Sequence, residues 1–300
     1  MSETVREYSG RTFSEADIEL IINVCKQYKH LSLAELVATV CELLSWTTPR
    51  GLPKRVPCES FLESLEAEGL VCLPAKQKKR HHRQRQIPVD QAREGALRTG
   101  EVRDYQPIQL QIVEKGKDLP LWRAYVERYH MLGDKTAFGS SLYYFIRSGE
   151  EKFGCLQFSA SAWALEARDT WLGWSLADRK ARLHLIVNNS RFLIFPWIQI
   201  HNLASHVLGQ VSRQIQTDWL EKYCYAPVLL ETFVDLEHFR GTCYKAANWI
   251  YLGETQGRGR MDREKAYTLS RKAIFMYPLQ KDYRACLLGQ KPPLHTEALI

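Results

Sequence analysis

The chain has 300 residues, of which 45% are hydrophobic and 25% are charged, proportions that are ordinary for a folded protein in water. No apolar stretch approaches the ~20 residues that cross a membrane, and the polar, acidic N-terminus excludes a secretory signal peptide. The length allows one large domain or two modest ones. The net charge of +7 suggests an anionic partner without establishing one. We therefore expect a cytoplasmic protein.

The eight cysteines lie mostly inside apolar runs. None belongs to a Cys-x-x-Cys pair, and no histidine spacing matches a zinc site. Reduced, buried thiols of a cytosolic protein explain this pattern. We predict no metal site from these residues.

Residues 1–75 are predicted to form a small helical domain. Helices with the Ser-x-x-acid start are expected after Ser14 and Ser32, and a third helix runs from about Pro57 to a cap at Gly69. A short strand is expected over residues 70–73. This order resembles a winged helix-turn-helix, in which the third helix enters the major groove.

DNA contact by this domain has an argument on each side. Arg50, Lys54 and Arg55 precede the third helix and could meet phosphates. The exposed face of that helix is acidic, however, with Glu59, Glu63, Glu66 and Glu68. A helical protein-interaction domain is the alternative interpretation.

Residues 76–105 are predicted to be a basic linker. Ten of them, residues 76–85, include six Lys or Arg and no apolar residue, so they cannot pack. Such arms bind nucleic-acid phosphates by releasing counterions; a spacer without contacts is the alternative. The expected phosphate-binding residues here are Lys76, Lys78, Lys79, Arg80, Arg83 and Arg85.

Residues 106–280 are predicted to be an α/β domain, followed by an irregular tail over residues 281–300. The order is a strand, a helix, a hairpin, a long central strand, a helix, a strand, a helix and two strands. This looks like the fold of the Gcn5-related acetyltransferase (GNAT) superfamily. In that superfamily a Gly-rich turn cradles the coenzyme A pyrophosphate at a helix N-terminus. The corresponding residues 196–205 contain no glycine, so acetyl-CoA is not expected as a cofactor.

Several long amino-acid runs resemble one family more specifically. They are LVCLP (70–74), LHLIVNNSRFLI (183–194), NLASH (202–206), LETFVD (230–235), FRGTCYKAANW (239–249) and LGET (252–255). Together they closely resemble the DruA family of the Druantia anti-phage systems, and the likeness covers nearly the whole chain. Similar domains also occur beside transposon genes and fused ahead of transposase catalytic domains. The resemblance implies a role in phage defence or mobile-element biology, acting with partner proteins on DNA, and carries no catalytic residue with it.

The candidate site lies where the strand over residues 228–234 meets the next helix. Glu231 and Asp235 share one sheet face, where paired carboxylates could bind a divalent metal or act as acid and base; alternatively, Glu231 is a buried hydrogen-bonded carboxylate and Asp235 a cap. Arg240, Tyr244 and Asn248 are spaced to follow one helix side. Tyr244 is a candidate proton donor or nucleophile, or simply a packed tyrosine.

Three further groups complete the candidates. His206, in the first turn of a helix that Asn202 should cap, is a possible base or phosphate donor. Asn188, Asn189 and Arg191 form a polar turn or bulge between apolar runs. Arg258 and Arg260, in a Gly-Arg repeat, are expected to contact phosphates or to lie in a solvated loop.

The function predicted from the sequence is a DNA-associated component of an anti-phage or mobile-element system, which binds nucleic acid and either processes it or only recognises it. The alternatives are a GNAT-type acyltransferase and a transposase accessory or remnant. The predicted partners are DNA and other proteins of the same system, with no membrane.

Overall fold

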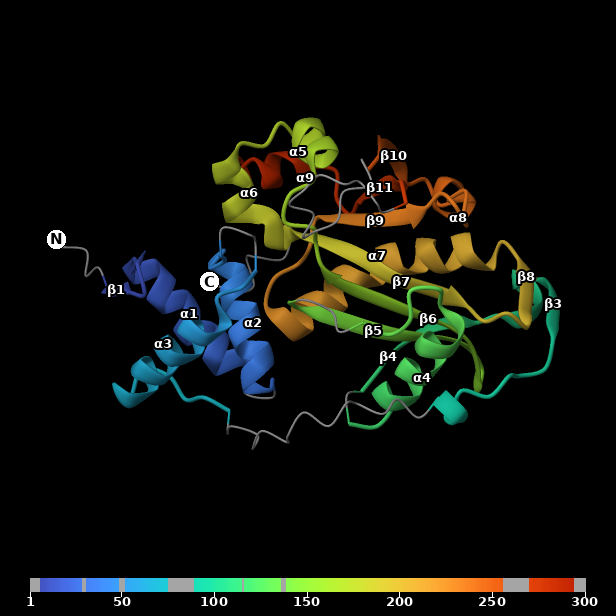
Figure 1. The fold of residues 1–300 in the computed structure, drawn as a ribbon, viewed down its shortest axis with the longest axis horizontal. Coiled ribbons are helices and arrows are strands. Elements are labelled where there is room, and N and C mark those ends of the chain that lie inside the picture. Colours follow the sequence, from blue (N-terminus) through green and yellow to red (C-terminus); the bar gives the residue numbers. More distant parts are fainter. Residues whose placement is uncertain are drawn as a thin grey trace.

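A computed structural model describes residues 6–28, 31–48, 52–74, 89–114, 116–135, 139–255 and 270–293. These ranges form an N-terminal helical unit and an α/β domain that pack side by side (Figure 1). Within them, none of the helices has the length and apolar character required to span a membrane.

The helical unit contains a small hairpin and three helices. The hairpin pairs β1 (Arg6–Tyr8) with β2 (Arg11–Phe13), and the helices are α1 (Glu15–Gln27), α2 (Leu33–Leu43) and α3 (Arg55–Ala67). The predicted capping boxes are present: the Ser14 and Ser32 side chains accept from the Asp17 and Glu35 amides. The three-helix prediction is therefore confirmed.

The predicted wing differs from the observed structure. Residues 70–73 form no strand, and the two strands of the unit precede α1 instead of following α3. Phe13 at the end of β2 stacks on Phe61 of α3, with ring centroids 4.3 Å apart, and meets Trp46 edge-on at 5.0 Å. Burial of these rings attaches the hairpin to the helices, which local sequence patterns do not reveal.

A seven-stranded mixed sheet forms the centre of the α/β domain. Its order is β10-β11-β9-β7-β6-β5-β4, and only the β7–β9 pair is parallel. The bounds are β4 (Ile108–Ile112), β5 (Ser141–Ser148), β6 (Glu151–Ala160), β7 (Ile186–Ile194), β9 (Leu229–Asp235), β10 (Ile250–Glu254) and β11 (Lys272–Pro278). The predicted α/β class and the acetyltransferase-like strand sequence are confirmed.

Helices and short elements complete the domain. The helices are α4 (Leu119–Tyr129), α5 (Glu166–Leu172), α6 (Leu176–Arg182), α7 (Leu203–Tyr223), α8 (Thr242–Ala246) and α9 (Tyr283–Leu287). Short 3-10 turns are η1 (Val89–Gln91), η2 (Val102–Tyr105) and η3 (Leu183–Leu185), and β3 (Arg98–Glu101) pairs in parallel with β8 (Ile198–His201). Part of the predicted linker, from residue 89, is thus folded, and the expected irregular tail contains α9.

The parallel pair β7 and β9 separates part-way along its length. Their register runs from Ile186↔Leu229 to Asn189↔Thr232 and ends there, although both strands continue. The shift between Gln157 and Phe158 in the β6 register leaves one extra residue in β7 beside Asn189. The predicted turn or bulge is therefore a bulge inside one continuous strand, and the two strands diverge beyond it.

The helical unit contacts the α/β domain directly. Tyr28 Oη donates to the Leu220 carbonyl of α7 at 3.1 Å, and Ser140 donates to the Glu42 carboxylate. Burial at this contact raises the pKa of Glu42 to about 7. Cys224, after α7, packs in the apolar core of the helical unit. The two parts therefore share buried surface.

Candidate functional site

A cleft of about 370 Å³ opens where β7 and β9 diverge. Its walls come from β7, β9, α8 and the segment after α4. The lining residues include Met131, Leu132, Asn189, Phe192, Thr232, Asp235, Phe239, Arg240, Gly241, Tyr244 and Lys272. Because sheet pairing stops at Asn189 and Thr232, strand separation is what creates the space.

Tyr244 lies at the buried base of this cleft. Its hydroxyl donates to Asn189 Oδ1 at 2.8 Å and lies 3.5 Å from Thr232 Oγ1, which donates to the Asn189 carbonyl at 3.0 Å. Burial raises the pKa of Tyr244 well above that of a free phenol. The phenol is therefore protonated at neutral pH, which disfavours the nucleophile hypothesis and fits the packed, hydrogen-bonded alternative.

Glu231 is a structural carboxylate. It is inaccessible to solvent, lies 2.9 Å from the equally buried Arg168 through Oε2 and Nη1, and accepts the Ala162 amide at 2.7 Å. Asp235 has a different set of partners. The prediction that Glu231 and Asp235 act as paired carboxylates is thus wrong, because the charge of Glu231 is neutralised by Arg168.

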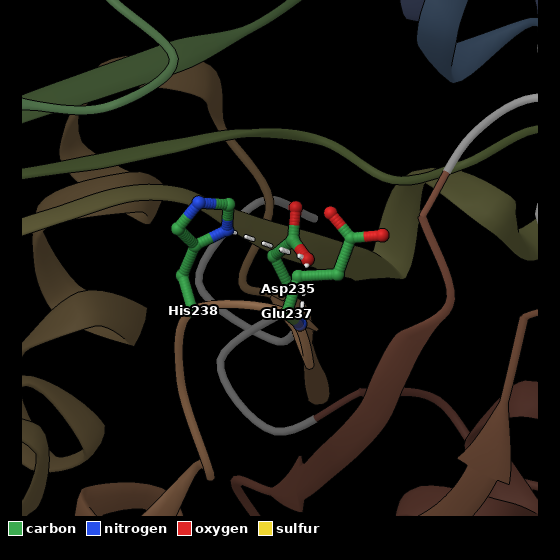
Figure 2. Close-up of side chains that lie close together, drawn as sticks. All are labelled: Asp235, Glu237 and His238. Atoms are coloured by element: carbon green, nitrogen blue, oxygen red, sulfur yellow. Dashed lines mark hydrogen bonds and ion pairs between the residues drawn. The ribbon is translucent and has the colours of Figure 1, made fainter.

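Asp235 belongs instead to a small cluster at the end of β9, together with Glu237 and His238 (Figure 2). One ligand atom from each residue lies within 4.8 Å of the others. Burial alone would raise the pKa of Asp235, but hydrogen bonds from Ser270 Oγ at 2.8 Å and the Glu237 amide at 3.1 Å, with His238 and Lys272 nearby, lower it overall. Two carboxylates and one imidazole could hold a divalent cation here, at the mouth of the cleft.

Arg240 and Asn248 do not follow one helix side with Tyr244. The α8 helix covers only Thr242–Ala246, so both residues lie outside it. Arg240 and Asn248 are exposed, whereas Tyr244 is buried. Arg240 lines the cleft, and Asn248 takes a positive φ of 61° after the helix. The predicted spacing was correct for a longer helix than the one that forms.

His206 lies in the first turn of α7, in a separate pocket of about 510 Å³ with Arg103 and His201. Its Nε2 lies 3.5 Å from Gln106 Nε2. Burial, and then the charge of Arg213, lower the pKa of His206. The structure does not bring it to the cleft with Tyr244.

Asn202 occupies the N-cap position of α7 with a left-handed φ of 60°, and its side chain caps nothing. The prediction of a capping side chain was therefore wrong.

The polar residues of β7 have structural partners. Asn189 Nδ2 donates to the Gln157 and Arg191 carbonyls, both at 3.1 Å. Arg191 donates to the Gly133 carbonyl at 2.9 Å and to the Ser190 carbonyl at 2.6 Å. Asn188 is half-buried, and its Oδ1 has no partner among the described residues. These residues shape the bulge, and Asn189 holds the Tyr244 hydroxyl.

The predicted phosphate contacts are only partly visible. Arg55 is exposed at the first residue of α3, and Arg240 is exposed at the cleft. The other predicted nucleic-acid residues lie outside the described residues: Lys76, Lys78, Lys79, Arg80, Arg83, Arg85, Arg258 and Arg260.

Sequence reasoning missed Arg168, Lys272 and His238. Arg168 sits in a Trp-rich segment whose helices were not predicted, and its partner Glu231 is 63 residues away. Lys272 reaches the cleft only because β11 pairs with β9. His238 is three residues from Asp235, a spacing that could have indicated the cluster from the sequence alone.

The family comparison matches the observed chain over most of its length. The family model described as Druantia protein DruA matches residues 64–284. The chain belongs to the DruA family. Membership supports a role as a component of a Druantia defence system. The matched residues of this DruA-family chain include the last turn of α3, the whole sheet and the cleft.

Comparison with solved structures finds acetyltransferases. A spermidine N-acetyltransferase from Vibrio cholerae has a TM-score of 0.39 and 9% identity, covering 61% of this chain and 97% of its own. An N-acetyltransferase from Staphylococcus aureus Mu50 has a TM-score of 0.36 and 8% identity, covering 57% of this chain and 97% of its own. A probable GNAT-family acetyltransferase from Chromobacterium violaceum ATCC 12472 has a TM-score of 0.37 and 10% identity, covering 63% of this chain and 85% of its own. No curated protein matches the chain. At these identities and TM-scores the likeness assigns no activity to the DruA-family chain.

Proposed function

We propose that this DruA-family protein is a DNA-binding component of a Druantia defence system. The observation that carries the proposal is the distribution of its charge. Residues 75–88 contain six Lys or Arg and no Asp or Glu, so they account for six of the net +7 and leave +1 for the rest of the chain. Residues 6–74, by contrast, contain seven basic and ten acidic residues.

This concentrated charge joins the helical unit to the α/β domain. It begins after residue 74, which follows α3, and ends before η1. A dense cationic segment releases condensed counterions when it meets DNA, and the affinity then falls steeply with salt. Such binding reads little sequence, which suits a protein that acts with partners on invading DNA.

The test is a binding titration of the full-length protein with duplex, nicked and single-stranded DNA over a range of salt concentrations. Replacing Lys78, Lys79 and Arg80 with Ala should weaken all binding and lower the magnitude of the log–log salt slope by roughly two to three for a duplex. Replacing the exposed Lys117, Lys135 and Lys281 is the matched control with the same charge change. If wild-type protein does not bind DNA at low salt, the proposal fails.

Whether the bound DNA is also processed is a second question for the same substrates. The Asp235, Glu237 and His238 cluster is the place in the described residues where a divalent cation fits. Incubation with Mg²⁺ or Mn²⁺ should give a product that Asp235→Asn abolishes, if the cluster supports cleavage. Glu231→Gln is uninformative here because Glu231 is paired with buried Arg168.

Acyl transfer is a second candidate function, favoured by the cleft between the diverging strands. A protonated Tyr244 at the base of a 370 Å³ cleft could donate a proton to a leaving group. Calorimetry with coenzyme A separates the two candidates. Heat of coenzyme A binding that is the same for wild type and Tyr244→Phe would indicate binding by the cleft walls without the Tyr244 hydroxyl. A flat titration of the wild-type protein would rule out acyl transfer from coenzyme A.

A further inference from the structure

A second, larger groove runs between the helical unit and α6. Its volume is about 1100 Å³, and it shares no lining residue with the cleft beside Tyr244. Figure 1 shows α6 above α2 at the end of the sheet where the helical unit packs. The groove is lined by Arg11, Asp17, Leu20, Leu43, Leu44, Ser45, Thr47, Thr48, Lys54, Trp163, Leu176, Ala177, Arg179, Lys180 and Ala181.

The groove is basic although the helical unit that forms one wall is acidic overall. Four cationic side chains line it, namely Arg11, Lys54, Arg179 and Lys180, against one carboxylate. That carboxylate, Asp17, accepts the Ser14 amide at 3.0 Å in the capping box of α1. Positive charge from both folded parts of the protein therefore converges on this groove.

Among the described residues Arg11 forms no ion pair within 4 Å, although the Asp17 carboxylate is near enough to act on it electrostatically. Its guanidinium carbon lies 5.2 Å from the ring centroid of Phe13 and 5.9 Å from that of Trp46. Its buried Nε has no hydrogen-bond partner in the described part of the chain. Aromatic stacking fixes the orientation of a guanidinium while leaving its donors for a ligand. Phosphate oxygens are suitable acceptors for such donors.

The opposite wall is also ordered by stacking and ion pairing. Arg179 lies 5.3 Å from the ring of Trp163 and donates to Asp169 Oδ2 at 2.7 Å. Trp163 is partly exposed, and Leu20 and Leu176 are exposed by 38% and 55%. An aromatic ring and apolar side chains beside cations match a ligand that carries both flat bases and phosphates.

We propose that this groove between the helical unit and α6 binds a single-stranded stretch of nucleic acid. Phosphates pair with Arg11, Lys54 and Lys180, and bases pack against Trp163 and the two exposed leucines. The inference rests on the proposed DNA-binding function and identifies the surface that binds the nucleic acid. It places the strand at the N-terminal end of α3, beside Lys54, and not along the later turns of that helix, where Glu66 and Glu68 are exposed.

The experiment measures binding of fluorescent oligo(dT) and of a hairpin duplex to full-length protein by anisotropy. The variant is Lys54→Ala with Lys180→Ala; the Lys54 side chain makes no cap hydrogen bond and Lys180 is exposed, so folding is preserved. Loss of two phosphate contacts should lower the salt slope for single strands by about 1.4 and weaken binding at fixed salt. Lys117→Ala with Lys281→Ala, the same charge change on exposed sites elsewhere, should behave as wild type.

A second readout locates the base contact. An oligonucleotide with 5-iodouracil should photo-cross-link to Trp163, identified by peptide mass spectrometry, and the Lys54/Lys180 double variant should lose this adduct.

The outcomes separate the two proposals. If wild-type protein binds oligo(dT) and the groove variant binds it with the same affinity as the control variant, the groove is not the binding site, whereas the proposed DNA-binding function stands. If the groove variant weakens duplex binding more than single-strand binding, the single-strand assignment is wrong. Binding of polyglutamate that depends on Lys54 and Lys180, without an effect on oligo(dT), would identify an acidic protein partner instead. If wild-type protein binds no nucleic acid, the proposed function itself fails.

Discussion

Arg168 and Glu231 form a fully buried ion pair, with Nη1 and Oε2 2.9 Å apart and neither side chain accessible to solvent. The pair links α5 to β9, the strand that runs parallel to β7 inside the sheet. Arg168 also donates to Asp169 Oδ1 at 2.8 Å, and Asp169 accepts from Arg179 at 2.7 Å. The sheet is thus connected through four charged side chains to the wall of the α6 groove.

Removing one member of this pair should destabilise the protein strongly. Arg168→Met leaves the Glu231 carboxylate buried without its counter-charge, and we expect a loss of about 3–5 kcal/mol in the free energy of unfolding. Urea denaturation monitored by circular dichroism measures it.

The surface pair supplies the control for that measurement. Arg6 lies 2.6 Å from Glu68, but the two side chains are 35% and 45% exposed, so Arg6→Ala should cost under about 1 kcal/mol. Equal effects of Arg168→Met and Arg6→Ala would contradict the assignment of Glu231 as a structural carboxylate.

Glu42, at the contact between α2 and the sheet, should make stability depend on pH. Burial raises its pKa to about 7 from an ordinary 4.5, against hydrogen bonds from Ser140 and Tyr225. Because the folded state holds the proton more tightly, this stabilisation is complete below pH 4.5 and is lost as pH rises through 7. Relative to wild type, Glu42→Gln should therefore gain up to about 3 kcal/mol as pH rises from 4.5 to above 7.

Comparison of wild type with Glu42→Gln separates the pH dependence due to Glu42 from that due to His184, which lines the same small cavity between the helical unit and the α/β domain. Burial lowers the pKa of His184 to about 4, so its contribution is lost as pH falls below 6.5. Urea midpoints measured from pH 4.5 to 8 supply the difference curve. Parallel curves for wild type and Glu42→Gln would show that Glu42 is not the titrating group.

Tyr244→Phe should reduce stability and leave nucleic-acid binding intact. The change leaves Asn189 Oδ1, which accepts the phenol proton at 2.8 Å, without its donor. A buried acceptor without a partner costs about 1–3 kcal/mol. Thermal unfolding and anisotropy with oligo(dT) measure the two properties. A folded Tyr244→Phe protein with unchanged stability would mean that water replaces the lost hydroxyl as the donor to Asn189 Oδ1.

Gly241→Ala should disturb the cleft through the start of α8. Gly241 has a φ of 66°, and an added Cβ would lie 2.7 Å from the ring of Phe275. Left-handed backbone and overpacking together should cost about 2–4 kcal/mol. Gly149→Ala is the matched control, with a φ of 54° and nothing within 4 Å, and should cost about 1 kcal/mol. Chemical denaturation of both variants decides; similar losses would show that Phe275 moves aside.

The helices were predictable where one short stretch carried both the apolar stripe and the cap. Ser14 and Ser32 each face an acid three residues later, so local hydrogen bonds define both helix starts. The hairpin of β5 and β6 follows likewise from its turn at residues 149–150. The wing expected at residues 70–73 failed because a four-residue apolar run forms a strand only when another strand pairs with it.

The sequence by itself determined the three N-terminal helices, the main strands of the α/β domain, the DruA motifs and the concentration of charge in residues 75–88, because periodicity, caps and composition are properties of neighbouring residues. The tertiary structure decided which polar residues meet. It paired Glu231 with Arg168, 63 residues apart, and so removed Glu231 from the candidate chemistry. It also opened the cleft above Tyr244 by separating β7 from β9, and brought Lys54 and Lys180 to one groove. Such contacts depend on long-range packing, which no local pattern encodes.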